Sequence, residues 1–389
     1  MNQKIIRLSI FFAVLFFGCE KFAQQPLVKD KTKPGELTNI RVVNIPGGAK
    51  ITYTLPDDED LLYVQANYTL QSGEKRAVKS SLYTNFVLIE GLADTTEHTI
   101  ELFAVDKSEN RSNPAQVKVY PETPPIQSVF RSINVQSDFG GINIHFENQL
   151  ENEYVFNTFI LDATGNWVRY DRLYTKVKER DYSIRGLPSQ ETVFGILVTD
   201  KWGNRTDTLK KVLTPIYEEK LDKKQWVLIT TLPSDFITPY SPSYGIPNLW
   251  NDVADFGQTD PNTSTLPSSF TVDLGAEYKF SRAKILQYNP LGGSAFMYGN
   301  IRKFEIWGGN VLLDDWSDWT LLVKGESIKP SGLPYGQATE EDKAYAAAGE
   351  DYSFPLNAPR FRYIRFKAIE TWAKNNYFYF DEMTLWGQK

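Results

Sequence analysis

An internal repeat in the first half of the chain restricts its fold more than any other feature. The pair Gly47-Gly48, in PGGAKITYTL, returns as Gly140-Gly141 in FGGINIHFE, and alternating apolar residues follow both pairs. Three further anchors return after 94 or 95 residues: Gly91 as Gly186, Asp106-Lys107 as Asp200-Lys201, and Asn110-Arg111 as Asn204-Arg205. Such regular spacing indicates two copies of one structural unit. Because each copy consists of short alternating segments separated by Gly, Pro and Asn, we expect two tandem β-sandwiches, at 37–121 and 125–216.

Both copies resemble fibronectin type III domains, and the resemblance implies an immunoglobulin-like sandwich for each. A Pro-rich join, PETPPI at 121–126, separates them.

The remaining stretch, 222–389, is predicted to be one larger all-β unit. SFTVDLG alternates apolar and polar residues, and KFEIWGG, WTLLVKG, RYIRFKAI and FYFDEMTLWG follow as further strands. One segment, TEEDKAYAAAGED, predicts a helix that begins after Thr339 and stops at Gly349. The order of these pieces resembles the factor V/VIII type C, or discoidin, superfamily. That resemblance implies a galactose-binding-like β jelly roll.

The N-terminus has the pattern of a secretory signal. Lys4 and Arg7 precede an apolar run of ten residues from Leu8 to Phe17, which is too short to span a bilayer. Gly18 comes directly before Cys19, the single cysteine of the chain, and this junction resembles a bacterial lipobox. The resemblance implies cleavage of residues 1–18 and lipidation of Cys19. The alternative is an ordinary signal peptide with an incidental cysteine.

Residues 19–36 then form a lipidated start and a polar, Pro-containing segment without apolar periodicity, which predicts a flexible tether. The whole layout resembles lipoproteins of Bacteroidetes polysaccharide-utilisation loci. It implies a lipid anchor in the outer membrane, exposure on the cell surface and membership of a glycan-import complex. The two sandwiches would then be spacers.

Charge and motifs exclude several classes of function. The net charge is −6, and removal of Lys4 and Arg7 with the signal makes it −8, which argues against nucleic acid as a partner. The chain contains no phosphate-binding glycine loop, HExxH or GxSxG motif. The acidic cluster DDWSDW at 314–319 is interpreted as a turn between strands with Trp319 packed inward. We therefore expect a protein that is not an enzyme and requires no cofactor.

Aromatic side chains in three loops of the C-terminal unit suggest a carbohydrate site instead. Sugars present flat C–H faces and many hydroxyl groups, so a site for them combines aromatic platforms with polar side chains. The loops are 240–257, 287–302 and 370–378, and we expect them to meet at one end of the jelly roll. The candidate glycan-binding residues are Tyr244, Trp250, Tyr288, Tyr298, Trp372, Asn375, Asn376 and Tyr377. For each aromatic residue alone, packing in the core is an equal alternative.

The resemblance to discoidin-like domains also implies a possible structural Ca²⁺. Asp252 and Asp255 match the acids of the first loop, Glu382 matches the acid of the last strand, and oxygen ligands suit calcium. The alternative is a polar loop without metal. The predicted function is glycan capture by a surface lipoprotein, and the alternative is adhesion or scaffolding, in which the same loops bind a partner protein.

Overall fold

A computed structural model describes residues 30–389 except 236 and 254. Cys19, the signal segment and most of the tether therefore lie outside the described residues. Among the residues described, no helix is long and apolar enough to cross a membrane. Contacts divide the chain into two compact units. The first extends to Arg131 and includes two later pieces, Asn152–Tyr154 and Val198–Thr206, and the second holds the rest. The predicted boundaries 37–121, 125–216 and 222–389 stay predictions.

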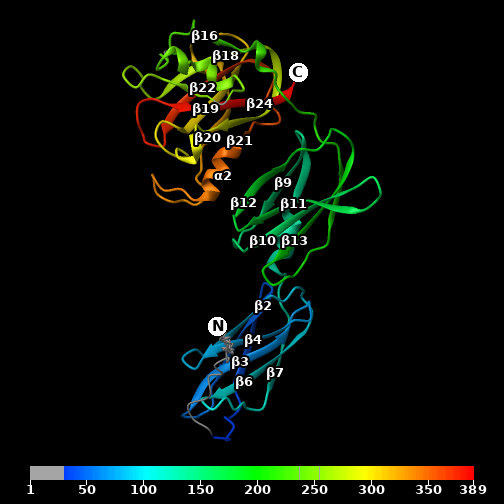
Figure 1. Cartoon of the computed structure of the whole chain (residues 1–389). Coiled ribbons are helices and arrows are strands. Elements are labelled where there is room, and N and C mark those ends of the chain that lie inside the picture. The colour runs from blue at the N-terminus through cyan, green and yellow to red at the C-terminus, as the bar shows by residue number, and fades with distance from the viewer. Residues whose placement is uncertain (1–29, 236, 254) are drawn as a thin grey trace, which may run out of the picture. The chain divides into compact units, whose positions relative to one another are not determined.

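Seven strands form the first β-sandwich (Figure 1). One sheet has the order β1-β2-β5 and the other β4-β3-β6-β7. Their inner faces carry fully buried aliphatic side chains such as Val64 and Ile89, which make the core between the sheets. The strands are β1 (Thr38–Ile45), β2 (Gly48–Thr54), β3 (Leu61–Thr69), β4 (Lys75–Ser81), β5 (Phe86–Glu90), β6 (His98–Asp106) and β7 (Ala115–Val119).

The next seven strands repeat this topology. The sheets have the orders β12-β9-β8 and β11-β10-β13-β14. Each strand is therefore equivalent to the strand of the first sandwich whose number is lower by seven, so that β8 corresponds to β1 and β14 to β7. The strands are β8 (Asn134–Asp138), β9 (Gly141–Glu147), β10 (Tyr154–Leu161), β11 (Trp167–Thr175), β12 (Glu179–Ile184), β13 (Thr192–Asp200) and β14 (Leu209–Leu213). The expected fold class of two tandem fibronectin-like sandwiches is confirmed.

The repeated glycines are required by the backbone. Gly47 and Gly140 both have positive φ, 69° and 63°, a conformation that favours glycine. A Cβ on Gly48 would lie 1.9 Å from a backbone carbonyl oxygen of β5, and one on Gly141 would lie 1.8 Å from the equivalent oxygen of β12. Any side chain at either position would push two paired strands apart.

The repeated Asp and Asn close a turn in both copies. The carboxylate of Asp106 accepts hydrogen bonds from the backbone and side-chain nitrogens of Asn110, at 2.8 and 2.9 Å. Asp200 accepts the same two bonds from Asn204, at 2.9 Å each. The anchors of the repeat are therefore structural residues.

A short helix, α1 (Pro125–Ser132), lies between the two sets of strands and was not predicted from the sequence. Pro125 is its first residue, where the missing N–H costs nothing because the first helical N–H groups have no partner within the helix. Ile126 and Val129 are buried. The prolines of the join thus begin a helix as well as end the preceding strand.

The C-terminal sheets form a jelly roll around one long strand, β18 (Ser268–Leu286). Its first half pairs with β16 and β22, and its second half pairs with β21 and β24. The register shifts between Asp273 and Tyr278, and Gly275 lies there with φ of 80°. This bend lets a single strand take part in both layers. The galactose-binding-like fold expected from the sequence is confirmed.

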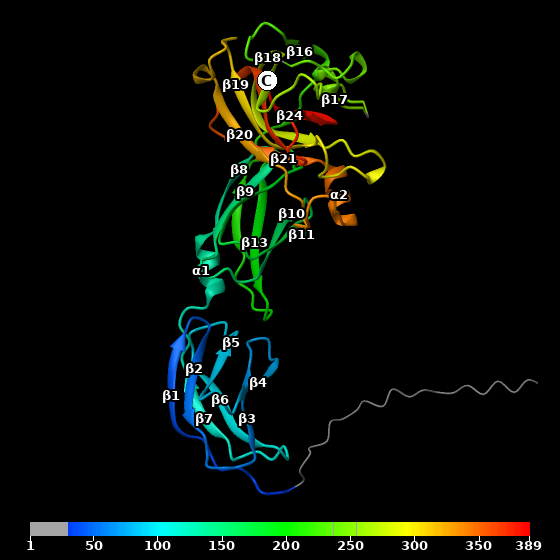
Figure 2. The same cartoon turned by 90° about the vertical axis from the view of Figure 1, so that its left-hand side faces the viewer.

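Short strands and helical turns complete this domain (Figure 2). Its other strands are β15 (Glu219–Lys220), β16 (Val227–Ile229), β17 (Gly257–Gln258), β19 (Ile301–Gly309), β20 (Thr320–Glu326), β21 (Glu350–Ser353), β22 (Phe361–Thr371), β23 (Tyr379–Phe380) and β24 (Glu382–Gln388). Its helical segments are η1 (Lys223–Gln225), η2 (Pro242–Tyr244), η3 (Ile246–Trp250), η4 (Pro290–Gly292), η5 (Trp316–Asp318) and α2 (Glu340–Ala348). The predicted helix is confirmed, with Thr339 and Asp342 forming a reciprocal capping box.

The acidic segment 314–319 is the turn expected between two strands. Asp315 caps η5, and Trp319 is buried with its indole N–H donating to the carbonyl of Leu313 at 2.9 Å. Asp314 accepts a hydrogen bond from the backbone of Ser234 at 3.0 Å. The side chain of Arg365 is buried next to this turn, with its guanidinium 4.0 Å from the ring of Trp316. These contacts are those of a packed corner.

Candidate functional site

Backbone hydrogen bonds hold three loops of the C-terminal domain side by side. The N–H of Thr259 donates to the carbonyl of Phe378 at 3.1 Å, which joins the first loop to the third. The N–H of Tyr379 donates to Gly299 at 2.8 Å, and that of Ala373 donates to Tyr298 at 2.9 Å, which joins the third loop to the second. The three loops named from the sequence therefore converge.

Five aromatic side chains from these loops and Tyr379 of β23 form a continuous group, which we call the tyrosine cluster. The ring of Phe256 lies 3.8 Å from that of Tyr288 and 4.7 Å from that of Tyr244, measured between centroids. Tyr379 meets Tyr288 edge to face at 5.8 Å. The members are Tyr240, Tyr244, Phe256, Tyr288, Tyr377 and Tyr379. The cluster spans all three loops, so it can contact one ligand from several sides.

The rings of the tyrosine cluster differ in exposure, and four of the six are partly exposed. Tyr240 is 51% exposed, whereas Tyr379 is buried beneath its neighbours. Burial raises the pKa of Tyr379, and the nearby hydroxyls of Tyr377, Tyr335 and Tyr288 add to the effect. Within the described part of the chain, no protein group makes a hydrogen bond to the hydroxyls of Tyr288 or Tyr377. These hydroxyls are available to donate to a ligand or accept from it.

Two carboxylates belong to the segments that carry the tyrosine cluster. Asp255 directly precedes Phe256, and the N–H of Asp381 donates to Leu286 at 2.8 Å, two residues before Tyr288. Burial, together with the negative charges of Glu382 and Asp255, raises the pKa of Asp381 to about 6. Carboxylates in this position can accept hydrogen bonds from ligand hydroxyl groups.

The three loops also contain unusual backbone conformations. Among the described residues, seven non-glycine residues have positive φ, and four of them lie in these loops: Asp252, Phe296, Tyr298 and Lys374. Such conformations cost free energy and tend to gather at functional sites.

Tyr335 was not predicted and belongs to a fourth loop, 329–338. Its hydroxyl accepts a hydrogen bond from the backbone N–H of Tyr298 at 3.2 Å, and both tyrosine rings are exposed. The ammonium of Lys329, itself buried, holds this loop by donating to the carbonyl oxygens of Leu333, Pro334 and Gln337 at 2.8–3.0 Å. All three hydrogens of the ammonium are therefore engaged.

The prediction that Trp250 offers a stacking face is wrong. Trp250 is 4% exposed and lies in the core, where its ring stacks on that of Phe270 at 6.0 Å. Trp250 is the last residue of η3, and its side chain is buried in the domain.

Trp372 is also mainly a packing residue. Its ring meets Phe296 edge to face at 5.2 Å, in a small cluster with Ala295 and Ala346. The cations of Arg302 and Lys329 lie 5.1 and 5.5 Å from its ring centroid. An indole so surrounded leaves little free aromatic face for a sugar.

The two predicted asparagines help to shape their loop. The side-chain amide of Asn376 donates to the carbonyls of Pro261 and Ser264, at 2.8 and 2.9 Å, so both of its hydrogens are engaged. Asn375 exchanges hydrogen bonds with Thr371. By contrast, Tyr244, Tyr288 and Tyr377 lie in the tyrosine cluster, and Tyr298 is exposed beside Tyr335.

The candidate calcium ligands are only partly brought together, and a lysine lies between them. Asp252 and Glu382 both accept hydrogen bonds from the ammonium of Lys223. Asp255 instead accepts from the side chain of Asn251 at 3.1 Å. Burial raises the pKa of Asp252, but hydrogen bonds from Lys220 and Lys223 outweigh it and lower the pKa overall. The residues present do not fit a calcium ion, because a cation of the chain already occupies the position.

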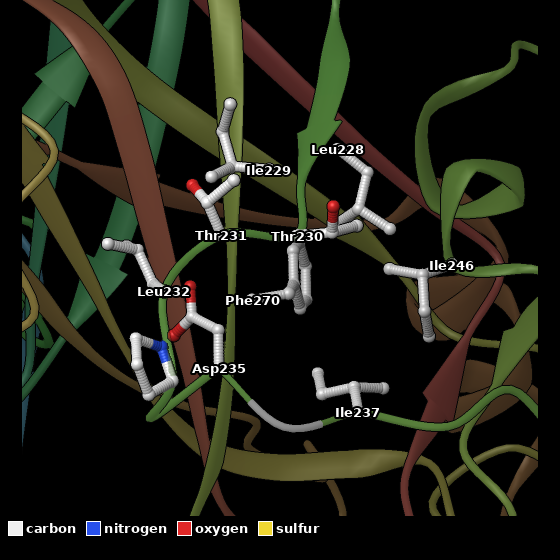
Figure 3. Close-up of a pocket in the computed structure, with 10 residues that line it drawn as sticks. Leu228, Ile229, Thr230, Thr231, Leu232, Asp235, Ile237, Ile246 and Phe270 are labelled. Atoms are coloured by element: carbon white, nitrogen blue, oxygen red, sulfur yellow. The ribbon is translucent and has the colours of Figure 1, made fainter.

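A separate cavity of about 390 Å³ opens between β16 and the loop that follows it (Figure 3). Leu228, Ile237 and Ile246 line it, with Asp235 at one side. The carboxylate of Asp235 already binds Arg365, Ser269 and Thr271. Among the described residues that line it, this cavity therefore offers a ligand aliphatic walls but no free charged group.

Several residues of the site were missed, although the sequence carried a signal for one of them. Tyr335 lies between Gly332 and Gly336, the same Gly-rich setting that led to the other loops. Phe256 lies in the first loop but was not singled out, and Tyr379 was missed because it reads as part of the strand segment FYFDEMTLWG. Nothing in the sequence placed Asp381 beside Asp255.

Comparisons with known proteins add three family matches. Residues 34–121 match DUF4959, residues 122–224 match DUF5126, and residues 248–387 match DUF5000. All three are described as domains of unknown function. No curated protein matches the chain.

Solved structures with related folds include one longer match. A SusE-like protein is 29% identical, with 68% of this chain and 99% of that chain covered and a TM-score of 0.43. The module CBM32-3 of a family 31 glycoside hydrolase from Clostridium perfringens is 19% identical, covering 43% and 95%, with a TM-score of 0.33. A two-domain fibronectin type III segment of chicken tenascin is 14% identical, covering 46% and 98%, with a TM-score of 0.24.

Proposed function

We propose that this chain binds a carbohydrate through the tyrosine cluster of its C-terminal domain. The observation that carries the proposal is the convergence of partly exposed aromatic rings with unengaged hydroxyls from separate loops, in segments that also carry Asp255 and Asp381. Aromatic rings bind the apolar face of a sugar, while phenol and carboxylate groups bind its hydroxyls. A protein partner would favour a larger and more continuous apolar surface.

The proposal also includes the cellular location of the protein. Cleavage after Gly18 and lipidation of Cys19 would anchor it in the outer membrane, facing the cell surface, with the two sandwiches as spacers. The support is the N-terminal sequence, with its short apolar run and its single cysteine. In this position the protein would capture glycans for an import complex and would not itself cleave them.

A glycan array of neutral and acidic oligosaccharides, followed by calorimetric titration of the best ligand, tests the proposal on the purified full chain. Tyr288→Ala removes a ring at the centre of the tyrosine cluster. Loss of such an anchor costs about 2 kcal/mol, so we expect an affinity roughly thirtyfold weaker. Tyr83→Ala is the matched control, because Tyr83 is 90% exposed on the first sandwich.

Two results would overturn the proposal. One is an array on which no oligosaccharide binds while a protein from the same cell surface does, which would favour the adhesion alternative. The other is a ligand whose affinity falls equally in Tyr288→Ala and Tyr83→Ala. Chromatography of the ligand after incubation should recover it intact, in keeping with a protein that binds and does not cleave.

A further inference from the structure

The ammonium of Lys223 is buried at the start of the C-terminal domain. The side chain is 5% exposed, and its nitrogen lies 2.9 Å from Asp252 Oδ1 and 2.9 Å from Thr384 Oγ1. It also donates to a carboxylate oxygen of Glu382. An ammonium has three hydrogens, and each has an acceptor here. The charge is thus fully paired, as burial of a charge requires.

Lys223 and its three acceptors come from three segments that are far apart in the sequence. Lys223 belongs to η1, Asp252 to the first loop of the candidate site, and Glu382 and Thr384 to β24. The N–H of Asp252 donates to the other oxygen of Glu382 at 3.0 Å, which closes the connection between loop and strand. Lys220 adds an exposed hydrogen bond to Asp252 at 2.8 Å, so two lysines balance two carboxylates.

Asp252 and Glu382 are two of the residues that the resemblance to discoidin-like domains implies as calcium ligands. Calcium needs six to eight oxygen ligands at about 2.3–2.6 Å. Here the nearest carboxylate oxygens already bind an ammonium, and a divalent cation beside it would be repelled. Lys223 would have to leave a buried position for the ion to enter.

We propose that Lys223 takes the place of the structural cation in this domain. Its ammonium fastens the loop at Asp252 to β24 and makes the domain independent of calcium.

Thermal melting of the full chain in EDTA, CaCl₂ and MgCl₂ is the first test. A domain that binds calcium gains roughly 5–10 °C when the ion is present at about a hundred times its dissociation constant. We expect the same melting temperature in all three solutions. A rise in CaCl₂ that EDTA reverses would overturn the proposal.

Substitution of the lysine is the second test, with a neighbour as control. Lys223→Met keeps the length of the side chain but leaves Glu382 without its cation and Asp252 with Lys220 alone, so we expect a lower melting temperature. Lys224→Met should melt like the unchanged chain, because Lys224 is exposed. Equal melting of the two variants would overturn the proposal. If Lys223→Met does not fold, the metal experiment still decides.

A double substitution isolates the pairing. Glu382→Gln alone leaves an ammonium with one charged partner fewer, whereas Lys223→Met with Glu382→Gln removes both members of the pair. We expect the double variant to be less destabilised than the two single effects together. Simple additivity would overturn the proposal. None of these measurements uses a carbohydrate, so their failure would leave the proposed function standing, and the converse also holds.

Discussion

Two groups of aromatic residues in the C-terminal domain have the same setting in the sequence and different surroundings in the structure. The tyrosine cluster and the two tryptophans, Trp250 and Trp372, all come from loops rich in Gly, Pro and Asn. The tyrosines contact one another and Phe256, and most of them stay partly exposed. Each tryptophan instead covers a buried phenylalanine, Phe270 or Phe296. Whether an aromatic side chain in a loop is exposed therefore depends on whether it packs against a buried residue of the core.

Trp250→Ala should give the largest effect, and it should be on stability. Removal of a buried indole costs about 3–5 kcal/mol, because it leaves a cavity in the core. Calorimetry or chemical denaturation should show this loss, while the affinity of the folded fraction for the best glycan should change little. A stable variant with weakened binding would reverse the assignment of Trp250.

Tyr288→Phe should give a smaller effect, and it should be on affinity. The variant keeps the ring that packs on Phe256 and removes a hydroxyl that no protein group engages. Loss of one ligand hydrogen bond costs about 1 kcal/mol, or roughly a fivefold weaker affinity by titration. The melting temperature should not change. Unchanged affinity would mean that the hydroxyl faces solvent in the complex.

Glu350→Gln should give the smallest effect, on the pH dependence of stability. Burial raises the pKa of Glu350 even though it accepts hydrogen bonds from Ser327, Gln287 and the backbone of Ile328. A carboxyl with a raised pKa stabilises the fold fully below its unfolded pKa of about 4.5, and this contribution is lost as pH rises through the folded value. Melting from pH 4 to 7 should therefore fall less steeply in the variant.

The opposite slope would contradict this prediction. Glu350 reaches Trp372 through Ser327, whose hydroxyl accepts from the indole N–H at 3.4 Å. Glycan affinity should be the same in Glu350→Gln and in the unchanged chain, because Glu350 lies outside the tyrosine cluster and its contacts are with residues of the domain itself.

The sandwiches could be predicted well from sequence because their constraints are local. Gly48 and Gly141 must be glycine wherever a neighbouring strand passes so close, and Asp106 and Asp200 close the same turn with a residue four positions away. These constraints recur at fixed spacing, so the repeat revealed them. Helix α1 was missed because the prolines were interpreted as a linker.

The candidate site could be predicted only in outline. Loop composition located the three loops, and three of the predicted tyrosines do lie in the tyrosine cluster. Burial of Trp250 depends on Phe270, which is twenty residues away and on another element. The pairing of Lys223 with Glu382 joins residues 159 positions apart. Contacts of this kind follow from the closure of the jelly roll, which a local pattern does not encode.

The hydrogen bonds of Lys329 to three carbonyl oxygens affect how the protein can be coupled chemically to a sensor chip. Amine-reactive esters acylate a free amine, and the ammonium of Lys329 is buried with all of its hydrogens engaged. Random coupling through lysines should therefore spare the loop that carries Tyr335. Lys374 is exposed in the third loop and would react. A Lys374→Arg form coupled in this way would keep both loops unmodified on a sensor chip.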